Sequence, residues 1–383
     1  GRVPGIPTQR SIRGVSEKTG EYKMSRKLYI RVDANSNVAI GHLMRCLTIA
    51  DACKEQKMEV EFIMAEDDGR ALVESRGYST WILHTDYQHM EEELPRLRAH
   101  FQHAPETEFR ALLVDSYQVT GAYLESLSKK IPVIYMDDLG EQAWPVQAVV
   151  NYNHYEIHLP YTQLYRKEKT KLLLGSAYTP LRPMFAEAAK TYEIRPRVKN
   201  VLISTGGSDP MEIADKLVHE LVLDSGMPSD ITLHVLCGPF SKSYESLKKY
   251  AEILGEERLQ LHSNVTDMAG LMSQCDLAVS ATGSTIYELC TVGVPTVSFY
   301  FAENQRLGAE ELDRIGAVPC AGEIPWKGDG SQILEHVLQR VLSQMKLYCR
   351  EPRLRQNASV YMRGIVDGRG AARLVEEFVG ILG

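Results

Sequence analysis

Short apolar runs alternate with amphipathic segments along the chain from Lys27 onward. The runs are continuously hydrophobic, which is typical of strands buried on both faces of a parallel sheet. The intervening segments have helical spacing, so the alternation predicts an α/β fold with helices on both faces. In the first half we expect strands at Leu28–Val32, Val60–Met64, Thr80–Leu83, Ala111–Val114, Val133–Met136 and Ala148–Asn151, and helices over residues 42–57, 68–76, 87–102 and 119–130.

The same pattern restarts after a join that contains Pro183 and Pro196. Proline interrupts a continuous helix, so the join separates two units. In the second half we expect strands at Asn200–Ser204, Ile231–Leu236, Leu259–His262, Leu277–Ser280 and Thr296–Phe299, and helices over residues 211–223, 241–254, 267–274, 284–291, 305–315 and 331–347. We therefore predict two doubly wound, Rossmann-like domains with a cleft between them.

Changes of pattern give the expected domain boundaries. Residues 1–23 are polar and have no hydrophobic period, so we interpret them as a flexible arm or an expression remnant. Residues 24–190 and 191–355 are the two predicted domains. Residues 356–383 include an amphipathic helix that could pack back onto the first domain. Because ligands of such sheets bind beyond the carboxyl ends of the strands, the cleft is the expected site.

The turn before His42 is the first loop that predicts chemistry. A buried strand ends at Val32, a small polar turn follows, and Gly41 precedes a helix that we expect to begin at His42. Free backbone N–H groups at such a helix start can hold an anion. His42 would then lie beside the anion. The alternative is a tight strand-to-helix connection without ligand, and the Gly-Lys-Ser/Thr sequence of a Walker loop is absent.

A second loop follows the first strand of the second domain. Gly206, Gly207 and Ser208 are small residues whose backbone amides can close on phosphate oxygens. The alternative is an ordinary turn in which Asp209 caps the next helix and Pro210 is its first residue. Both interpretations can hold together, because the cap and the phosphate use different amides.

A third loop contains Gly283 and Ser284 and leads into a helix that carries Glu288 one turn inside. A carboxylate there can accept hydrogen bonds from the two vicinal hydroxyls of a ribose. The alternative is a solvated glutamate that complements the helix dipole.

Acidic side chains gather where the strands of the first domain end: Asp33, Asp115, Asp137 and Asp138. We expect at least one of them to line the cleft, although such residues also cap helices. Asn151 and Asn153 follow another strand, and their amides suit the hydroxyl or acetamido groups of a sugar.

Composition narrows the class of protein. A formal charge of −7 over 383 residues argues against a general nucleic-acid binder. Seven cysteines without a Cys-x-x-Cys pair favour a reducing compartment. We find no apolar stretch of membrane-spanning length, no secretory signal and no metal-ligand spacing. These features predict a cytoplasmic protein without membrane association, metal or cofactor, and leave its oligomeric state open.

Taken together, these motifs resemble a known family. They are Arg31-x-Asp33, Ile40-Gly41-His42-x-x-Arg45-Cys46, Asp115-Ser116-Tyr117, Asp137-Asp138, Asn151-x-Asn153, Gly206-Gly207-Ser208-Asp209 and Ser280-Ala281 followed by Glu288. From about Lys27 to about Ala317 their order is similar to that of the pseudaminic-acid pathway hydrolases. Those enzymes act on UDP-2,4-diacetamido-2,4,6-trideoxy-β-L-altropyranose. The wider group has the GT-B fold and includes the MurG-like glycosyltransferases.

The resemblance implies a reaction in which a UDP-sugar and water give UDP and the free sugar. It implies His42 as the catalytic base, with Asp33 and Tyr117 as further catalytic candidates. It also implies nucleotide contacts at Gly41, Gly206, Gly207, Ser208, Gly283, Ser284, Glu288 and Asn304. The chain departs from the family pattern at Ala39, where a second glycine is frequent, and at Tyr287, where an asparagine can stand.

Other functions remain open at this point. A GT-B glycosyltransferase would share the fold and the nucleotide loops while passing the sugar to an acceptor hydroxyl. A nucleotide-sugar binding protein would not need the histidine, and a UDP-sugar epimerase would release an inverted sugar.

Overall fold

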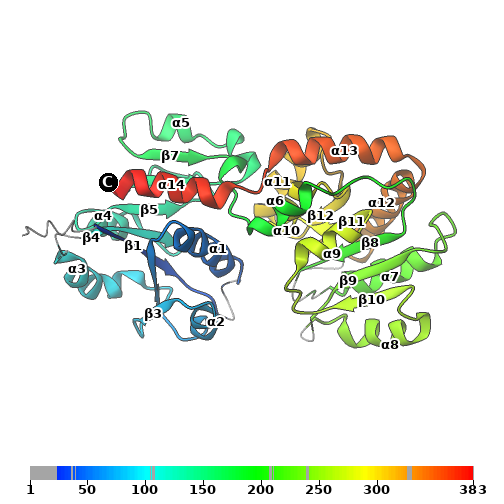
Figure 1. The fold of residues 1–383 in the computed structure, drawn as a ribbon, viewed down its shortest axis with the longest axis horizontal. Coiled ribbons are helices and arrows are strands. Elements are labelled where there is room, and N and C mark those ends of the chain that lie inside the picture. The colour runs from blue at the N-terminus through cyan, green and yellow to red at the C-terminus, as the bar shows by residue number, and fades with distance from the viewer. Residues whose placement is uncertain are drawn as a thin grey trace, which may run out of the picture.

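The computed structural model describes residues 24–35, 38, 40–103, 105, 108–206, 209, 211–238, 241–325 and 330–382. Two α/β halves lie side by side, each built on one parallel sheet (Figure 1). The carboxyl ends of the strands in each sheet lead into the loops that carry the predicted site residues.

The first sheet has seven strands in the order β3-β2-β1-β4-β5-β6-β7, and its pairs are parallel. Its strands are β1 (Ser25–Val32), β2 (Glu59–Met64), β3 (Ser79–Ile82), β4 (Glu108–Asp115), β5 (Val133–Met136), β6 (Ala148–Asn151) and β7 (Lys171–Leu174). The helices of this half are α1 (Gly41–Glu55), α2 (Arg70–Ser75), α3 (Leu94–Gln102), α4 (Gly121–Ser128), α5 (Tyr161–Leu164) and α6 (Pro183–Ala189), with short 3₁₀ turns η1 (Met90–Glu93), η2 (His154–His158) and η3 (Ser176–Tyr178).

The second sheet has six strands in the order β10-β9-β8-β11-β12-β13, again in parallel pairs. Its strands are β8 (Asn200–Ser204), β9 (Thr232–Leu236), β10 (Leu259–His262), β11 (Leu277–Ala281), β12 (Thr296–Tyr300) and β13 (Cys320–Glu323). The helices that follow β8 along the chain are α7 (Ile213–Leu223), α8 (Tyr244–Leu254), α9 (Met268–Gln274), α10 (Ser284–Val292), α11 (Glu303–Arg314), α12 (Ser331–Arg350), α13 (Pro352–Ile365) and α14 (Gly370–Leu382), of which α14 packs on the first half.

Every predicted strand is present, but the pattern missed β7 and β13 at the two sheet edges. It also missed α6 and α13, which begin at Pro183 and Pro352. Proline is well tolerated in the first turn of a helix, where the N–H that it lacks would have no partner. The boundary expected between residues 355 and 356 therefore falls inside α13.

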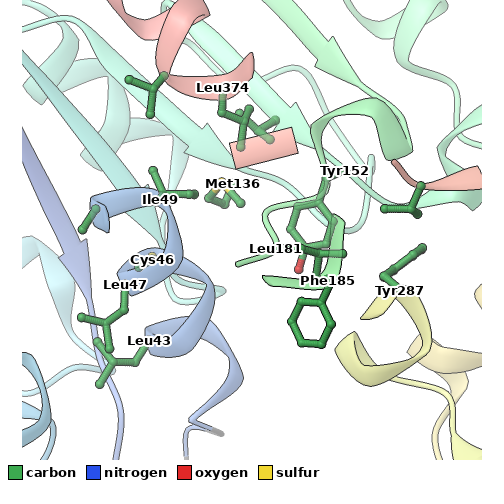
Figure 2. Packing of buried hydrophobic residues seen from close by; sticks show 14 of the residues in the cluster. Leu43, Cys46, Leu47, Ile49, Met136, Tyr152, Leu181, Phe185, Tyr287 and Leu374 are labelled. Carbon is green, nitrogen blue, oxygen red and sulfur yellow. The ribbon is translucent and has the colours of Figure 1, made fainter. Parts of the chain in front are cut away.

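One apolar cluster joins the two halves. Figure 2 shows it running from α1 through Tyr152, Leu181 and Phe185 to Tyr287 on α10. Separate clusters cover the opposite faces of the two sheets. The halves are therefore held together by shared hydrophobic packing as well as by the chain.

The last helix, α14, returns to the first half and packs on α1 (Figure 1). Leu374 and Phe378 are fully buried there, and Glu377 pairs with Lys171 of β7. A Cβ atom on Gly370 would lie 2.1 Å from the carbonyl oxygen of Thr179, so glycine permits the close approach of the two backbones. None of the described helices has the combined length and hydrophobicity that a membrane span needs.

We predict that Leu374→Ala lowers the free energy of unfolding by about 2–5 kcal/mol, because it leaves a cavity between α14 and α1. Chemical denaturation followed by circular dichroism measures this. The matched control is Glu376→Ala on the exposed face of the same helix, which should change stability by less than about 0.5 kcal/mol. Equal effects of the two substitutions would contradict the packing described.

Candidate functional site

Arg45 of α1 is the centre of a polar cluster at the carboxyl edge of the first sheet. Its guanidinium contacts Asp115 through Nε–Oδ2 at 2.6 Å and Nη2–Oδ1 at 2.6 Å. It also reaches Asp138 through Nη2–Oδ2 at 3.0 Å and Nη1–Oδ1 at 3.1 Å, and Nη1 donates to the Tyr152 hydroxyl at 2.9 Å. The three partners stand at or just beyond the ends of β4, β5 and β6. One cation thus joins three neighbouring strand ends.

The electrostatics of the cluster are dominated by this cation. Burial opposes ionisation of Asp115, but the charge and hydrogen bonds of Arg45, with a smaller contribution from His42, hold the pKa of Asp115 well below its usual range. Burial likewise opposes the charge of Arg45, and Asp115 and Asp138 more than compensate, so its pKa is raised. The guanidinium and the Asp115 carboxylate therefore stay charged at neutral pH.

His42, the second residue of α1, is oriented by the same carboxylate. Its Nδ1 lies 2.7 Å from Asp115 Oδ1, and its ring packs edge-on against Tyr117 at 4.8 Å between centroids. With Nδ1–H donating to Asp115, Nε2 carries the free lone pair. Among the described residues Nε2 has no hydrogen-bond partner.

Tyr117 follows β4 and donates its hydroxyl proton to Asp138 Oδ2 at 2.6 Å. Burial of the hydroxyl and the charge of Asp138 raise its pKa, so the phenol remains protonated. Tyr117 thus connects the His42 ring to the second carboxylate of the cluster.

Asp33 has a different environment from the one that we expected. Its Oδ2 pairs with the buried Arg31 at 2.6 Å, and its Oδ1 accepts the Ala65 N–H at 2.8 Å. Arg31 is in turn held by Glu93. Within the described part of the chain these are the contacts of the Asp33 carboxylate. They tie together the carboxyl ends of β1 and β2, which is a structural role. We assign Asp33 no catalytic role.

A cavity of about 200 Å³ lies between the two halves. Its first-half wall includes Arg45, Tyr117, Asp138, Leu139, Tyr152, Asn153 and Tyr155, and its second-half wall includes Thr282, Gly283, Ser284, Ile286, Tyr287, Gln305 and Gly308. We call this the interdomain cavity. His42 does not itself line it, but contacts two residues that do, Arg45 and Tyr117.

Two polar contacts cross between the halves beside this cavity. The Tyr287 hydroxyl accepts the His154 N–H at 3.0 Å. His158 Nε2 lies 2.7 Å from Glu311 Oε2, and Arg314 also pairs with Glu311. These contacts fix η2 of the first half against α10 and α11 of the second.

Gly206 and Asp209 are among the described residues of the loop that follows β8. Gly206 has a φ of +94°, which favours glycine. Gly207, Ser208 and Pro210 lie outside the described residues. Asp209 accepts the N–H groups of Ile213 at 2.9 Å and Ala214 at 3.0 Å, so it caps α7 from four residues upstream of the first helical residue.

The N-terminus of α10 separates two cavities. Gly283 and Ser284 line the interdomain cavity, and Thr285 lines a second cavity with Gly206, Cys237, His262, Ser263, Val265 and Met268. We call the second one the β8–β10 cavity. No side chain caps this helix start, and a Cβ on Gly283 would meet nothing within 4 Å. The Ile286 N–H is paired with the Gly283 carbonyl at 3.2 Å, and N–H groups that keep no partner at a helix start can bind an anion.

Glu288 lies one turn inside α10 and is an isolated acid. Burial raises its pKa to about 7, and the charge of Arg182 offsets part of this effect. Its carboxyl group makes no hydrogen bond or ion pair to any described residue. Glu288 is half-buried and lines neither the interdomain cavity nor the β8–β10 cavity, so its carboxyl group is an acceptor without a described partner beside them.

Gly41 and Asn304 are the remaining residues expected to contact the nucleotide, and Gly41 lines neither of the two cavities. Gly41 is the first residue of α1, and no atom lies within 4 Å of its Cβ position. Asn304 lies in α11 next to Gln305, which lines the interdomain cavity. Among the described residues no three His, Cys, Asp or Glu side chains are arranged to hold a metal ion.

Arg45, Tyr152 and Tyr155 are cavity residues to which the sequence pattern assigned no role. One signal was available, because Arg45 lies three residues after His42 and hence on the same helix face. The structure also identifies Asp138 as the strand-end acid that lines the interdomain cavity, as expected for at least one of the four.

Comparison with known protein families finds no match to a family model. Two curated relatives are similar over most of the chain. The spore coat polysaccharide biosynthesis protein SpsG of Bacillus subtilis is 25% identical over 90% of this chain and 95% of its own. The UDP-2,4-diacetamido-2,4,6-trideoxy-β-L-altropyranose hydrolase of Campylobacter jejuni is 23% identical over 76% of this chain and 97% of its own.

Solved structures confirm the fold class. MurG of Acinetobacter baumannii superposes with a TM-score of 0.64 at 15% identity, over 93% of this chain and 99% of its own. Staphylococcus aureus MnaA, solved with UDP, superposes with a TM-score of 0.60 at 14% identity, over 94% of this chain and 97% of its own. The protein therefore has the GT-B architecture of two Rossmann-like domains.

We predict that Asp115→Asn lowers the free energy of unfolding at pH 7 by about 3 kcal/mol, because Arg45 loses a buried partner. In the wild type the lowered pKa of Asp115 gives stability above its unfolded value of 3.8, and this stability is lost as pH falls below it. The difference between variant and wild type should therefore shrink on acidification. Denaturant titrations at pH 7 and pH 3 measure it, and a constant difference would contradict the assignment.

Proposed function

We propose that this protein hydrolyses a UDP-linked 2,4-diacetamido-2,4,6-trideoxy hexose to UDP and the free sugar, in a nonulosonic acid pathway such as that of pseudaminic acid. One observation carries the proposal. Two cavities meet at the open N-terminus of α10, and the His42–Asp115–Arg45 cluster stands at the first-half wall of one of them. This arrangement suits a molecule with an anionic centre and two uncharged ends.

In this proposal the diphosphate lies at the start of α10. The N–H groups near Ser284, the loop at Gly206 and the helix dipole supply donors and positive potential for it. The nucleoside occupies the β8–β10 cavity, and Glu288 accepts hydrogen bonds from the ribose hydroxyls. The second half is then the nucleotide-binding domain, and α14 belongs to the first, sugar-binding half.

The sugar lies in the interdomain cavity. Tyr152, Tyr155 and Leu139 give its wall apolar surface, while Asp138 and Asn153 supply polar groups. A 6-deoxy sugar with acetamido substituents has matching methyl and amide groups. The name of the Campylobacter jejuni relative gives independent support for this substrate class.

In the proposed reaction His42 acts as the general base, a role that its hydrogen bond to Asp115 supports. From behind Arg45 and Tyr117 on the cavity wall, its Nε2 takes a proton from water, whose oxygen attacks the anomeric carbon as the bond to the β-phosphate oxygen breaks, with inversion. UDP leaves with the electron pair of that bond, and donors at α10 stabilise the charge. Asp115 holds the ring and stabilises the imidazolium that forms. No step in this scheme uses a metal ion.

A second function has a specific observation in its favour. The likeness to MurG covers nearly the whole chain, and a GT-B glycosyltransferase would use the same nucleotide contacts. It would pass the sugar to an acceptor hydroxyl instead of water. Release of UDP from the donor in the absence of acceptor separates the two functions, since only the hydrolase turns over repeatedly under that condition.

We predict that His42→Ala lowers the rate of UDP release from the diacetamido UDP-sugar by about 10²–10⁴-fold, because the general base is lost. A coupled UDP assay measures the rate. The dissociation constant of UDP should stay within about threefold of the wild-type value, since His42 does not line the nucleotide cavity. Turnover at the wild-type rate would remove His42 from the mechanism.

We predict that UDP binding strengthens as pH rises through about 7, where Glu288 ionises, because the carboxylate accepts hydrogen bonds from the ribose. Glu288→Gln should bind UDP about tenfold more weakly at pH 8. Titration calorimetry of both proteins from pH 6 to pH 8 isolates this effect, since the ionisation of UDP itself cancels in the comparison.

Without UDP, the wild type and Glu288→Gln should rank in stability opposite to their rank in UDP affinity. Glu288 has a raised pKa of about 7 in the folded state against 4.5 in the unfolded chain, so its ionisation lowers stability as pH rises between these values. Glu288→Gln should therefore be more stable than the wild type at pH 8. A variant that is weaker in both properties would indicate a structural role for Glu288.

A further inference from the structure

We propose that His262 reads the nucleobase, and that it does so by accepting a hydrogen bond from the N3–H imide of uracil. The inference rests on the proposed function, which puts the nucleoside in the β8–β10 cavity. His262 is the last residue of β10 and lines that cavity. It is the one imidazole among the lining residues that the structure describes.

His262 belongs to a hydrogen-bonded chain of three side chains on one face of the second sheet. Its Nε2 lies 3.0 Å from Nδ1 of His234, and Nε2 of His234 lies 2.9 Å from Oδ1 of Asn200. His234 is only 4% exposed and does not line the cavity. The hydrogen-bonded series therefore leads from Asn200 on the buried β8, through His234 on β9, to His262 at the cavity wall.

The Asn200 side-chain oxygen, which can only accept, determines which nitrogen of each histidine donates and which accepts. The Asn200 Oδ1 atom accepts a proton from His234 Nε2, so a neutral His234 has a lone pair at Nδ1. That lone pair accepts from Nε2–H of His262, which leaves His262 with a lone pair at Nδ1. Burial lowers the pKa of both histidines, and the charge of His262 would lower that of His234 further, which keeps the pair neutral.

The free Nδ1 of His262 is thus a hydrogen-bond acceptor offered to a ligand in the cavity. It has no hydrogen-bond partner among the described residues. Uracil carries a donor at position 3, whereas cytosine carries a lone pair there. Two facing lone pairs repel and leave both groups unsatisfied, so this acceptor favours uracil over cytosine.

Titration calorimetry with UDP and CDP tests the assignment. The wild type should bind UDP about 10–100-fold more tightly than CDP. His262→Phe keeps the ring and removes both nitrogens, so the ratio of the two dissociation constants should fall toward one. The ratio is measured on one protein preparation and is therefore insensitive to a partly unfolded fraction. The matched control is His219→Phe, because His219 of α7 stacks on Tyr250 and does not line the cavity.

His234 is a positioning residue in this proposal. His234→Phe breaks the chain without changing the cavity wall, frees the tautomer of His262, and should lower the UDP-to-CDP ratio as well. A purely structural role would weaken both nucleotides alike and leave the ratio unchanged.

The outcomes separate this inference from the proposed function. A wild type that binds UDP while His262→Phe keeps the wild-type ratio, or that binds CDP equally well, overturns the role of His262 and leaves the hydrolase standing. A wild type that binds neither nucleotide overturns both.

Discussion

The site depends on the charge of Arg45, which is held between two carboxylates. The ends of β4 and β5 bring Asp115 and Asp138 to the same edge of the sheet, and without a cation these acids would repel each other. Because both are fixed by the guanidinium, Asp115 can direct the His42 ring and Asp138 can hold the Tyr117 hydroxyl. A buried cation is costly unless its partners are in place, so the loss of either carboxylate would leave Arg45 with uncompensated charge.

The second half contributes the complementary element, which is a helix start without a cap. Gly283 precedes α10, no described side chain caps the start of this helix, and no atom lies within 4 Å of the Gly283 Cβ position. Asp209 shows the contrast within the same domain, since it saturates the first amides of α7. The first amides of α7 are therefore already paired within the protein, whereas no described side chain pairs with those of α10.

Much of the architecture could be predicted from the sequence, because buried parallel strands are continuous apolar runs. The edges could not, since β7 follows a charged stretch and β13 contains glycine. For the candidate site, residue type and spacing predicted the loops and His42. Asp33 and Asp115 were indistinguishable by that criterion, because both are acids at strand ends. Only the structure shows that Asp33 pairs with Arg31 and that Asp115 pairs with Arg45.

The return of α14 to α1 has a consequence for how the molecule is made. A ribosome releases the first half long before residues 370–382, yet the hydrophobic face of α1 is covered by that last helix. The apolar face of α1 therefore stays exposed in the nascent first half while the second half is translated. A chain that terminates before residue 370 would therefore lack a finished first half, even when all of that half's strands are present.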